Sequence, residues 1–184
     1  MKLLRFRSRN SAAVPDDAVP RVIVENLDAL YATALRLCGR ADIAEDVVQE
    51  SVRKALHAVP GLLHQRQIRA WIFKILMNCM RDHFREHARR PEHPFPDEEL
   101  TLAASSWQSQ NIAFDVRLAL EALSVERRAV VLLVDWEGFT IADSAAILNL
   151  PPGTVASRLA RAHLQLRDFL RSYETGKIPV RGES

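Results

Sequence analysis

Polar side chains that could bind an anion or a base edge recur at helical spacing near the C-terminal end of the chain. They are Thr154, Ser157, Arg158, Arg161 and Gln165. Because these positions are three or four residues apart, they share one face of an α-helix. Hydroxyls, guanidinium groups and amides suit phosphates and base edges in the major groove of DNA. The pattern favours DNA binding, and a plain helical hairpin with a solvated basic face is the alternative.

The helix that positions these residues is expected to be the second of a pair within residues 140–171. Thr140 and Asp143 form a capping-box signature, which predicts the start of the first helix. The Pro-Pro-Gly sequence after Asn149 turns the chain, because proline lacks the amide proton that a continuing helix needs. The second helix should run from about Thr154, with these residues facing inward: Val155, Leu159, Ala162, Leu166 and Phe169.

A cationic face is expected on an earlier helix, over residues 70–87. Its polar residues are spaced by four, three and four positions: Lys74, Asn78, Arg81 and Arg85. Its expected buried stripe is Trp71, Ile72, Ile75, Leu76 and Cys79. Residues 62–90 contain seven lysines and arginines against two acids, which leaves a net charge of +5. A solvated face is the usual explanation of such a stripe, but its one-sidedness also favours an anionic partner.

Two helices should precede this one. The first is expected from Pro20 to a stop at Gly39, with inward-facing Ile23, Leu27, Leu30, Tyr31, Ala34 and Leu37. Asp42 and Glu45 repeat the capping signature and open the second, whose inward-facing residues are Ala44, Val47, Val48, Val52, Ala55 and Leu56. Its outer face is acidic: Asp42, Glu45, Asp46, Gln49 and Glu50. Acidic residues in the first turn of a helix complement the helix dipole, which accounts well for Asp42, Glu45 and Asp46. The dipole accounts poorly for Glu50, which lies further along the helix.

One short motif raises metal-dependent catalysis as a third possibility. His83, Glu86 and His87 match the inverted zinc-protease motif, in which two histidines bind zinc and the glutamate activates water. The motif lies in an arginine-rich helix end, and the sequence places no third ligand, so we expect no metal, no cofactor and no catalytic residue. Cys38 and Cys79 sit in apolar helical patterns without a ligand cluster, which fits a reducing cytoplasm.

The overall pattern predicts an all-α protein of two small helical domains. The chain has 184 residues, 48% of them hydrophobic, and a net charge of +2, so only the distribution of charge argues about partners. No apolar run reaches the ~20 residues needed to cross a bilayer, so we expect no membrane insertion. The expected segments are a disordered basic tail (1–19), a first domain (20–90), an acidic, proline-containing linker (91–111), a four-helix helix-turn-helix domain, winged-helix-like but without the wing (112–173), and a flexible tail (174–184).

Three stretches in this order resemble bacterial RNA polymerase sigma factors of the extracytoplasmic-function (ECF) kind. They are DIAEDVVQESVRKAL, RAWIFKILMNCMRDHFREHARR and LVDWEGFTIADSAAILNLPPGTVASRLARAHLQLR. The resemblance covers roughly residues 21–173 and implies that residues 20–90 are sigma region 2 and residues 112–173 are sigma region 4. It implies a cytoplasmic initiation factor whose partners are core RNA polymerase, through the clamp and flap, promoter DNA and an anti-sigma factor.

The resemblance also implies a role for each polar face. Contact with the polymerase clamp falls to Asp42, Glu45, Asp46, Gln49 and Glu50. Binding of the melted −10 strand falls to His64, Gln65, Arg66, Arg69, Lys74, Asn78 and Arg81. Recognition of the −35 duplex falls to Thr154, Ser157, Arg158 and Arg161. The chain departs from the family at Ala156 and His163, where the family usually has a cation and commonly an arginine, which leaves the preferred −35 sequence open.

The competing hypotheses are a conventional regulator that binds duplex DNA unaided through residues 140–171, and the zinc enzyme. Neither explains the acidic face at residues 42–50 together with the basic face at 66–90. We therefore expect a transcription initiation factor without catalytic activity of its own.

Overall fold

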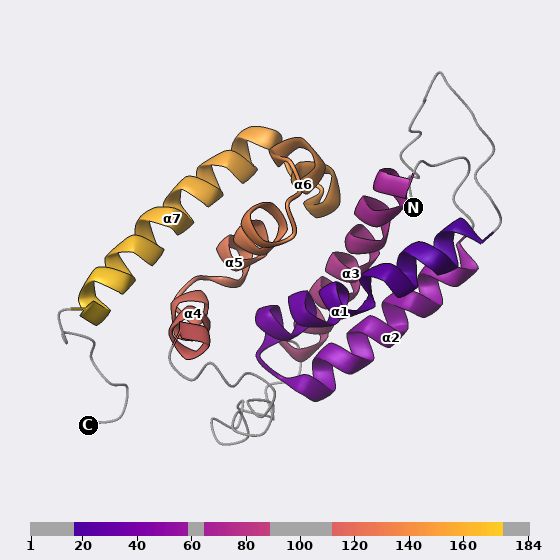
Figure 1. Cartoon of the computed structure of the whole chain (residues 1–184), viewed down its shortest axis with the longest axis horizontal. Coiled ribbons are helices and arrows are strands. Elements are labelled where there is room, and N and C mark those ends of the chain that lie inside the picture. Colours follow the sequence, from indigo (N-terminus) through magenta and orange to yellow (C-terminus); the bar gives the residue numbers. More distant parts are fainter. Residues whose placement is uncertain (1–16, 59–64, 89–111, 175–184) are drawn as a thin grey trace.

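The structure, a computed structural model, describes residues 17–58, 65–88 and 112–174. Helices make up all the regular structure in these ranges, and no strand occurs in them, which confirms the all-α prediction. The expected acidic linker and most of both expected tails lie outside the described residues. Figure 1 shows two groups of helices, α1 to α3 and α4 to α7, lying side by side.

The N-terminal group consists of α1 (Ala18–Cys38), α2 (Ala41–His57) and α3 (Gln65–Ala88), and each helix packs against the other two. Gly39 ends α1 as predicted, in a left-handed conformation with φ of 73° that glycine adopts without steric cost. The helix begins at Ala18, which is buried. The helix therefore starts two residues before the expected Pro20.

Several details of these helices were predicted wrongly. Leu27 and Leu56 were predicted to face inward, but both are exposed. Each lies at the side of its helix, outside the face that the buried residues form. Asp42 does not cap α2, whose N-cap is Arg40 without a side-chain cap hydrogen bond. α3 begins at Gln65, five residues before the expected start at residue 70.

The C-terminal group consists of α4 (Ile112–Glu121), α5 (Val125–Val131), the π-helical turn η2 (Leu132–Trp136), α6 (Ile141–Leu148) and α7 (Pro152–Glu174). The helix-turn-helix of α6 and α7 is confirmed, although α7 begins two residues before Thr154, with Pro152 in its first turn. Ser124 is the N-cap of α5, but its side chain makes no cap hydrogen bond.

The capping box of α6 is formed as predicted. The backbone N–H of Asp143 donates to Thr140 Oγ1 over 3.0 Å, and the Thr140 hydroxyl donates to Asp143 Oδ2 over 2.8 Å. Asn149 ends the helix in a left-handed conformation with φ of 56°, which asparagine tolerates better than most residues. These two ends fix the length of α6 and the direction in which α7 leaves it.

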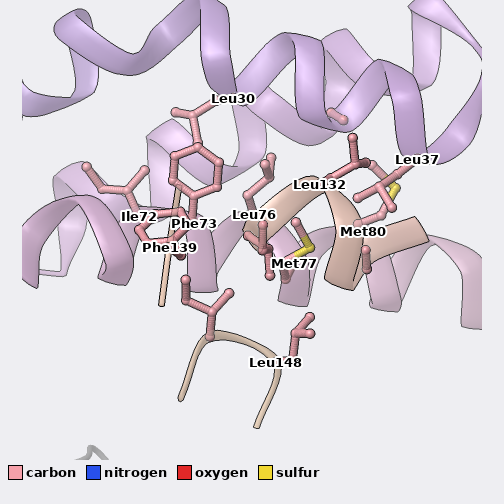
Figure 2. Close-up of a cluster of buried hydrophobic side chains, with 14 of the residues drawn as sticks. Leu30, Leu37, Ile72, Phe73, Leu76, Met77, Met80, Leu132, Phe139 and Leu148 are labelled. Atoms are coloured by element: carbon pink, nitrogen blue, oxygen red, sulfur yellow. The ribbon is translucent and has the colours of Figure 1, made fainter. Parts of the chain in front are cut away.

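The two groups share one continuous core, in which α3 packs against α6 (Figure 2). Phe73 and Phe139 meet edge to face, with ring centroids 5.0 Å apart. Phe73 and Met77 were absent from the predicted stripe of α3, yet both are buried. The helical periodicity of the sequence predicted one narrow buried stripe. In the structure α3 buries nearly half its circumference, because it contacts both groups of helices.

Candidate nucleic-acid interface

The acidic face of α2 points away from the core. Asp42, Glu45, Asp46 and Gln49 are exposed and Glu50 is half-buried. Asp42 accepts hydrogen bonds from Arg40, which lower the pKa of its carboxyl. Glu45, Asp46 and Gln49 make no hydrogen bond or ion pair with any residue in the described part of the chain.

Glu50 has a local explanation that the sequence pattern did not provide. Its carboxylate accepts from Arg53 Nε and Nη2, both over 2.7 Å, and lies 3.3 Å from Lys54 Nζ. The hydrogen bonds from Arg53 are the main cause that lowers the pKa of Glu50 to about 2. Glu50 is therefore ionised throughout the physiological range and anchors a charge cluster on α2.

The predicted −10 residues on α3 are only partly exposed. Lys74 and Asn78 are half-buried, and burial lowers the pKa of the Lys74 ammonium, with a smaller contribution from nearby Arg81. Arg81 is exposed, but its guanidinium donates to the Leu148 carbonyl at the end of α6 and to Asn78 Oδ1, both over 3.3 Å. His64 and the side chains of Gln65 and Arg66 lie outside the described residues.

Arg69 is engaged by the C-terminal group of helices. Its Nη2 lies 2.6 Å from Glu137 Oε2, its Nη1 donates to the Glu137 carbonyl over 3.0 Å, and its Nε donates to Asn26 over 2.8 Å. Its guanidinium carbon also stands 4.4 Å from the centre of the Phe139 ring. The other carboxylate oxygen of Glu137 accepts from the Thr33 hydroxyl over 3.0 Å. Two residues of the N-terminal group thus hold one carboxylate of the C-terminal group.

Arg128 makes a second connection between the two groups. It is buried, and it donates to the carbonyls of Arg36 and Leu37 at the end of α1 and to those of Glu121, the last residue of α4, and Leu123, over 3.1–3.2 Å. The ends of two helices concentrate unpaired carbonyls and partial negative charge, which suits a buried cation. Nothing in the sequence singled out Arg128, Thr33 or Glu137, because their partners are distant in the chain.

The first three turns of α7 present the predicted −35 residues. Ser157 and Arg161 are exposed, Thr154 and Arg158 are half-buried, and the Ser157 hydroxyl donates to the Thr154 carbonyl over 3.0 Å. All four share one side of the N-terminal half of the helix, as predicted. A row of hydroxyl and guanidinium groups on an exposed helix can enter a major groove.

Two further residues of α7 differ from the expectations. Gln165 was placed on the same exposed face, but it accepts from Arg127 over 2.7 Å and donates to the Ala122 carbonyl over 2.6 Å, so it ties α7 to the preceding helices. His163 stands 2.7 Å from Asp135 of η2. Its ring is therefore held by a carboxylate within the same group of helices.

Metal and membrane sites find no support in the described residues. In these ranges no group of three or more His, Cys, Asp or Glu side chains lies close enough to hold a metal ion. Cys38 and Cys79 are free thiols. No helix within the described ranges is both long and apolar enough to cross a bilayer.

Comparison with known families places the chain in one class. Residues 22–90 match the model of Sigma-70 region 2, and residues 113–166 match that of Sigma-70, region 4. The chain is 33% identical to the ECF RNA polymerase sigma factor EcfG of Rhodopseudomonas palustris over 155 residues, which is 84% of this chain and 86% of the relative. It is 35% identical to the ECF sigma factor SigL of Mycobacterium tuberculosis over 164 residues, 86% of this chain and 92% of the relative.

Solved structures agree. The sigma factor RpoE from Bartonella quintana, in complex with the anti-sigma factor NepR, matches with a TM-score of 0.64 and 28% identity over 84% of this chain and 98% of that one. CnrH in complex with the cytosolic domain of CnrY matches with a TM-score of 0.60 and 27% identity over 84% of this chain and 88% of that one. The fold and the matched regions define a sigma factor of RNA polymerase. The chain belongs to the ECF subfamily and functions in promoter recognition at transcription initiation.

Proposed function

We propose that this sigma factor assigns one helical domain to each promoter element. Residues 20–90 bind core polymerase and the −10 element, residues 112–173 bind the −35 element, and residues 91–111 connect them. The opposite charges of the exposed faces support this division. The unpaired acids of α2 suit a basic protein surface, whereas the arginines of α7 suit DNA.

The contact with core polymerase is assigned to Asp42, Glu45, Asp46, Gln49 and Glu50. The observation that supports it is that Glu45, Asp46 and Gln49 are exposed on α2 without a polar partner in the described part of the chain. Helical acids whose charge serves only the fold would be expected to pair locally, as Glu50 does. The polymerase clamp is the partner that family membership suggests for this face.

The −10 strand is assigned to His64, Gln65, Arg66, Arg69, Lys74, Asn78 and Arg81. Cations bind the backbone phosphates of a melted strand, and the amide of Asn78 can read the edge of an unstacked base. The −35 duplex is assigned to Thr154, Ser157, Arg158 and Arg161, which lie together on the exposed start of α7. The family usually has a cation at the position of Ala156 and commonly an arginine at that of His163. These two departures reduce the positive charge of this helix.

The protein needs no catalytic activity of its own, because the polymerase performs the chemistry. It acts in the cytoplasm, where its polymerase and promoters are. An anti-sigma factor is a further partner, since the structures of RpoE and CnrH were solved with NepR and CnrY bound. Such a partner would hold the sigma factor away from the polymerase.

Site-specific photocrosslinking in the holoenzyme–promoter complex tests the division of labour. A crosslinker at Ser157 should label duplex DNA at the −35 element, and one at Lys74 should label the non-template strand at the −10 element. The assignment would be contradicted if Ser157 labelled the −10 element and Lys74 the −35 element, or if neither residue crosslinked to DNA. A crosslinker at exposed Asp28 of α1 is the control that should label neither element.

A further inference from the structure

The closed arrangement, defined here as the packing of α3 against α6 with Arg69 bound to Glu137, brings the two proposed DNA-binding surfaces close together. The Arg81 guanidinium lies 3.3 Å from the carbonyl oxygen of Leu148. Thr154 follows Leu148 by six residues, and six residues span at most about 22 Å. A −10 residue and a −35 residue are therefore separated by little more than the width of one DNA duplex.

Promoter DNA requires a much larger separation. The names of the two elements place them about 25 base pairs apart, and at about 3.4 Å per base pair this is on the order of 85 Å. Duplex DNA has a persistence length of about 500 Å, so a spacer this short cannot fold back to bring its ends together at a modest energetic cost. The closed arrangement cannot bind both elements at once.

The same arrangement also occupies a proposed DNA-binding group. Arg69 is bound by the Glu137 carboxylate, whose side chain is 5% exposed, against 28% for that of Arg69. Thr33 fixes the second carboxylate oxygen, and the Phe139 ring covers the guanidinium. A carboxylate and a phosphate make the same kind of charge-assisted hydrogen bonds to arginine. Glu137 therefore takes the place that an anionic DNA group would fill.

We propose that Glu137 is an intramolecular competitor of promoter DNA, which occupies Arg69 in the closed molecule and must release it before the −10 strand binds. This inference rests on the proposed function, because it takes Arg69 as a DNA-binding residue. The free protein then has part of its −10 surface covered by its own C-terminal group of helices. Binding to polymerase and promoter must separate the two groups. In the closed state the Glu137 carboxylate binds Thr33 and Arg69, and the shared apolar core and Arg128 also join the two groups of helices.

Two substitutions that weaken the closed state test this proposal in the full chain. Glu137→Gln removes the charge but keeps the size of the side chain, and Thr33→Val removes only the hydroxyl that binds Glu137 from the other domain. Glu25→Gln is the matched control, because Glu25 lies on the exposed side of α1, 3.8 Å from Arg21. Circular dichroism checks that each variant is folded, and Thr33→Val decides the outcome if Glu137→Gln is not.

Small-angle X-ray scattering of the free chain provides the first measurement. A compact chain of this length has a radius of gyration of about 16 Å, and Glu137→Gln and Thr33→Val should both give a larger radius than the wild type, whereas the control should not. The second measurement is the concentration of sigma factor that gives half-maximal run-off transcription with purified core polymerase. Both variants should lower it about fivefold, because more of the chain is competent to bind. A half-maximal concentration that is unchanged in both variants would refute the competition.

Arg69→Ala separates this proposal from the proposed function. It should expand the free chain as Glu137→Gln does, because Glu137 loses its partner. It should nevertheless transcribe less than the wild type, because it also removes a residue that binds DNA. If Arg69→Ala transcribed as well as Glu137→Gln, and the wild type were active, the competition would be refuted and the proposed function would not. A wild-type chain that gives no transcript with core polymerase would instead refute the proposed function.

Discussion

Arg161 is the residue on which −35 recognition depends most directly. It is exposed on α7 and makes no hydrogen bond or ion pair with another residue in the described part of the chain. Arg161→Ala should cost about 2 kcal/mol of promoter binding, or roughly thirtyfold in affinity, by loss of a base or phosphate contact. The measurement is holoenzyme binding to a −35/−10 promoter fragment.

The control is Arg167→Ala, which removes an exposed arginine from another face of the same helix. It should leave promoter affinity within about twofold of the wild type. Equal losses from the two substitutions would mean that α7 contributes only its net charge. Affinity for core polymerase should be unchanged in both.

Asp46 provides the corresponding test of the acidic face. Asp46→Lys should weaken binding of the chain to core polymerase by about tenfold or more, since it places a like charge against a basic surface. Asp28→Lys, the same reversal at an exposed position of α1, is the control. Fluorescence anisotropy with labelled chain measures both, and equal affinities would remove α2 from this interface.

The titration of Glu50 follows from its contacts with Arg53 and Lys54. The pKa of Glu50 is lowered to about 2, below its ordinary 4.5, so its contribution to stability is full above pH 4.5 and is lost as the pH falls through about 2. NMR titration of the carboxyl group should give a midpoint near this value. Arg53→Ala should return the midpoint most of the way to the ordinary value, and a midpoint that does not move would contradict the ion pair.

At the scale of the single helix, α6 depends on its cap. Thr140→Ala should lower the free energy of unfolding by about 1 kcal/mol, because the N–H of Asp143 loses its acceptor. Ser124→Ala is the matched control, since Ser124 occupies the N-cap of α5 without a side-chain cap hydrogen bond. Thermal unfolding should show a clear decrease for the first variant and a smaller one for the second; the reverse order would contradict the role of the capping box.

How far the sequence predicts these elements depends on how local their signals are. The capping box at Thr140 and the left-handed stop at Gly39 were predicted because each lies within one turn of the residues it affects. The polar rows of α2 and of the start of α7 were also predicted, because helical periodicity determines which residues share a face. Asp42 shows the limit of a local signature, since its carboxylate binds the Arg40 side chain and the N-cap of α2 is Arg40.

The residues between the domains could not be predicted in this way. Glu137 lies 68 positions from Arg69 and 104 from Thr33, so no periodic pattern relates them. The burial of Phe73 and Met77 likewise depends on α6, which packs on α3 from a distant part of the chain. Periodicity identifies an apolar face but does not identify what covers it.

At the scale of the whole molecule, Arg128 joins the two domains from within. Arg128→Met should destabilise the protein by about 3 kcal/mol, because four carbonyls lose their donor and two of these hydrogen bonds are buried. Arg117→Met, which removes a half-buried arginine 3.7 Å from Glu121, should cost under about 1 kcal/mol. Urea unfolding measures both, and equal losses would show that Arg128 has no special part in holding the domains together.

The most direct test of the account as a whole is run-off transcription with purified core polymerase, with and without the chain, on a library of promoters. We predict that the chain directs specific initiation at a subset of templates that share a −35 and a −10 sequence, at levels far above core polymerase alone. Transcription no greater or more selective than that of core polymerase alone would contradict the central claim that this chain provides promoter recognition.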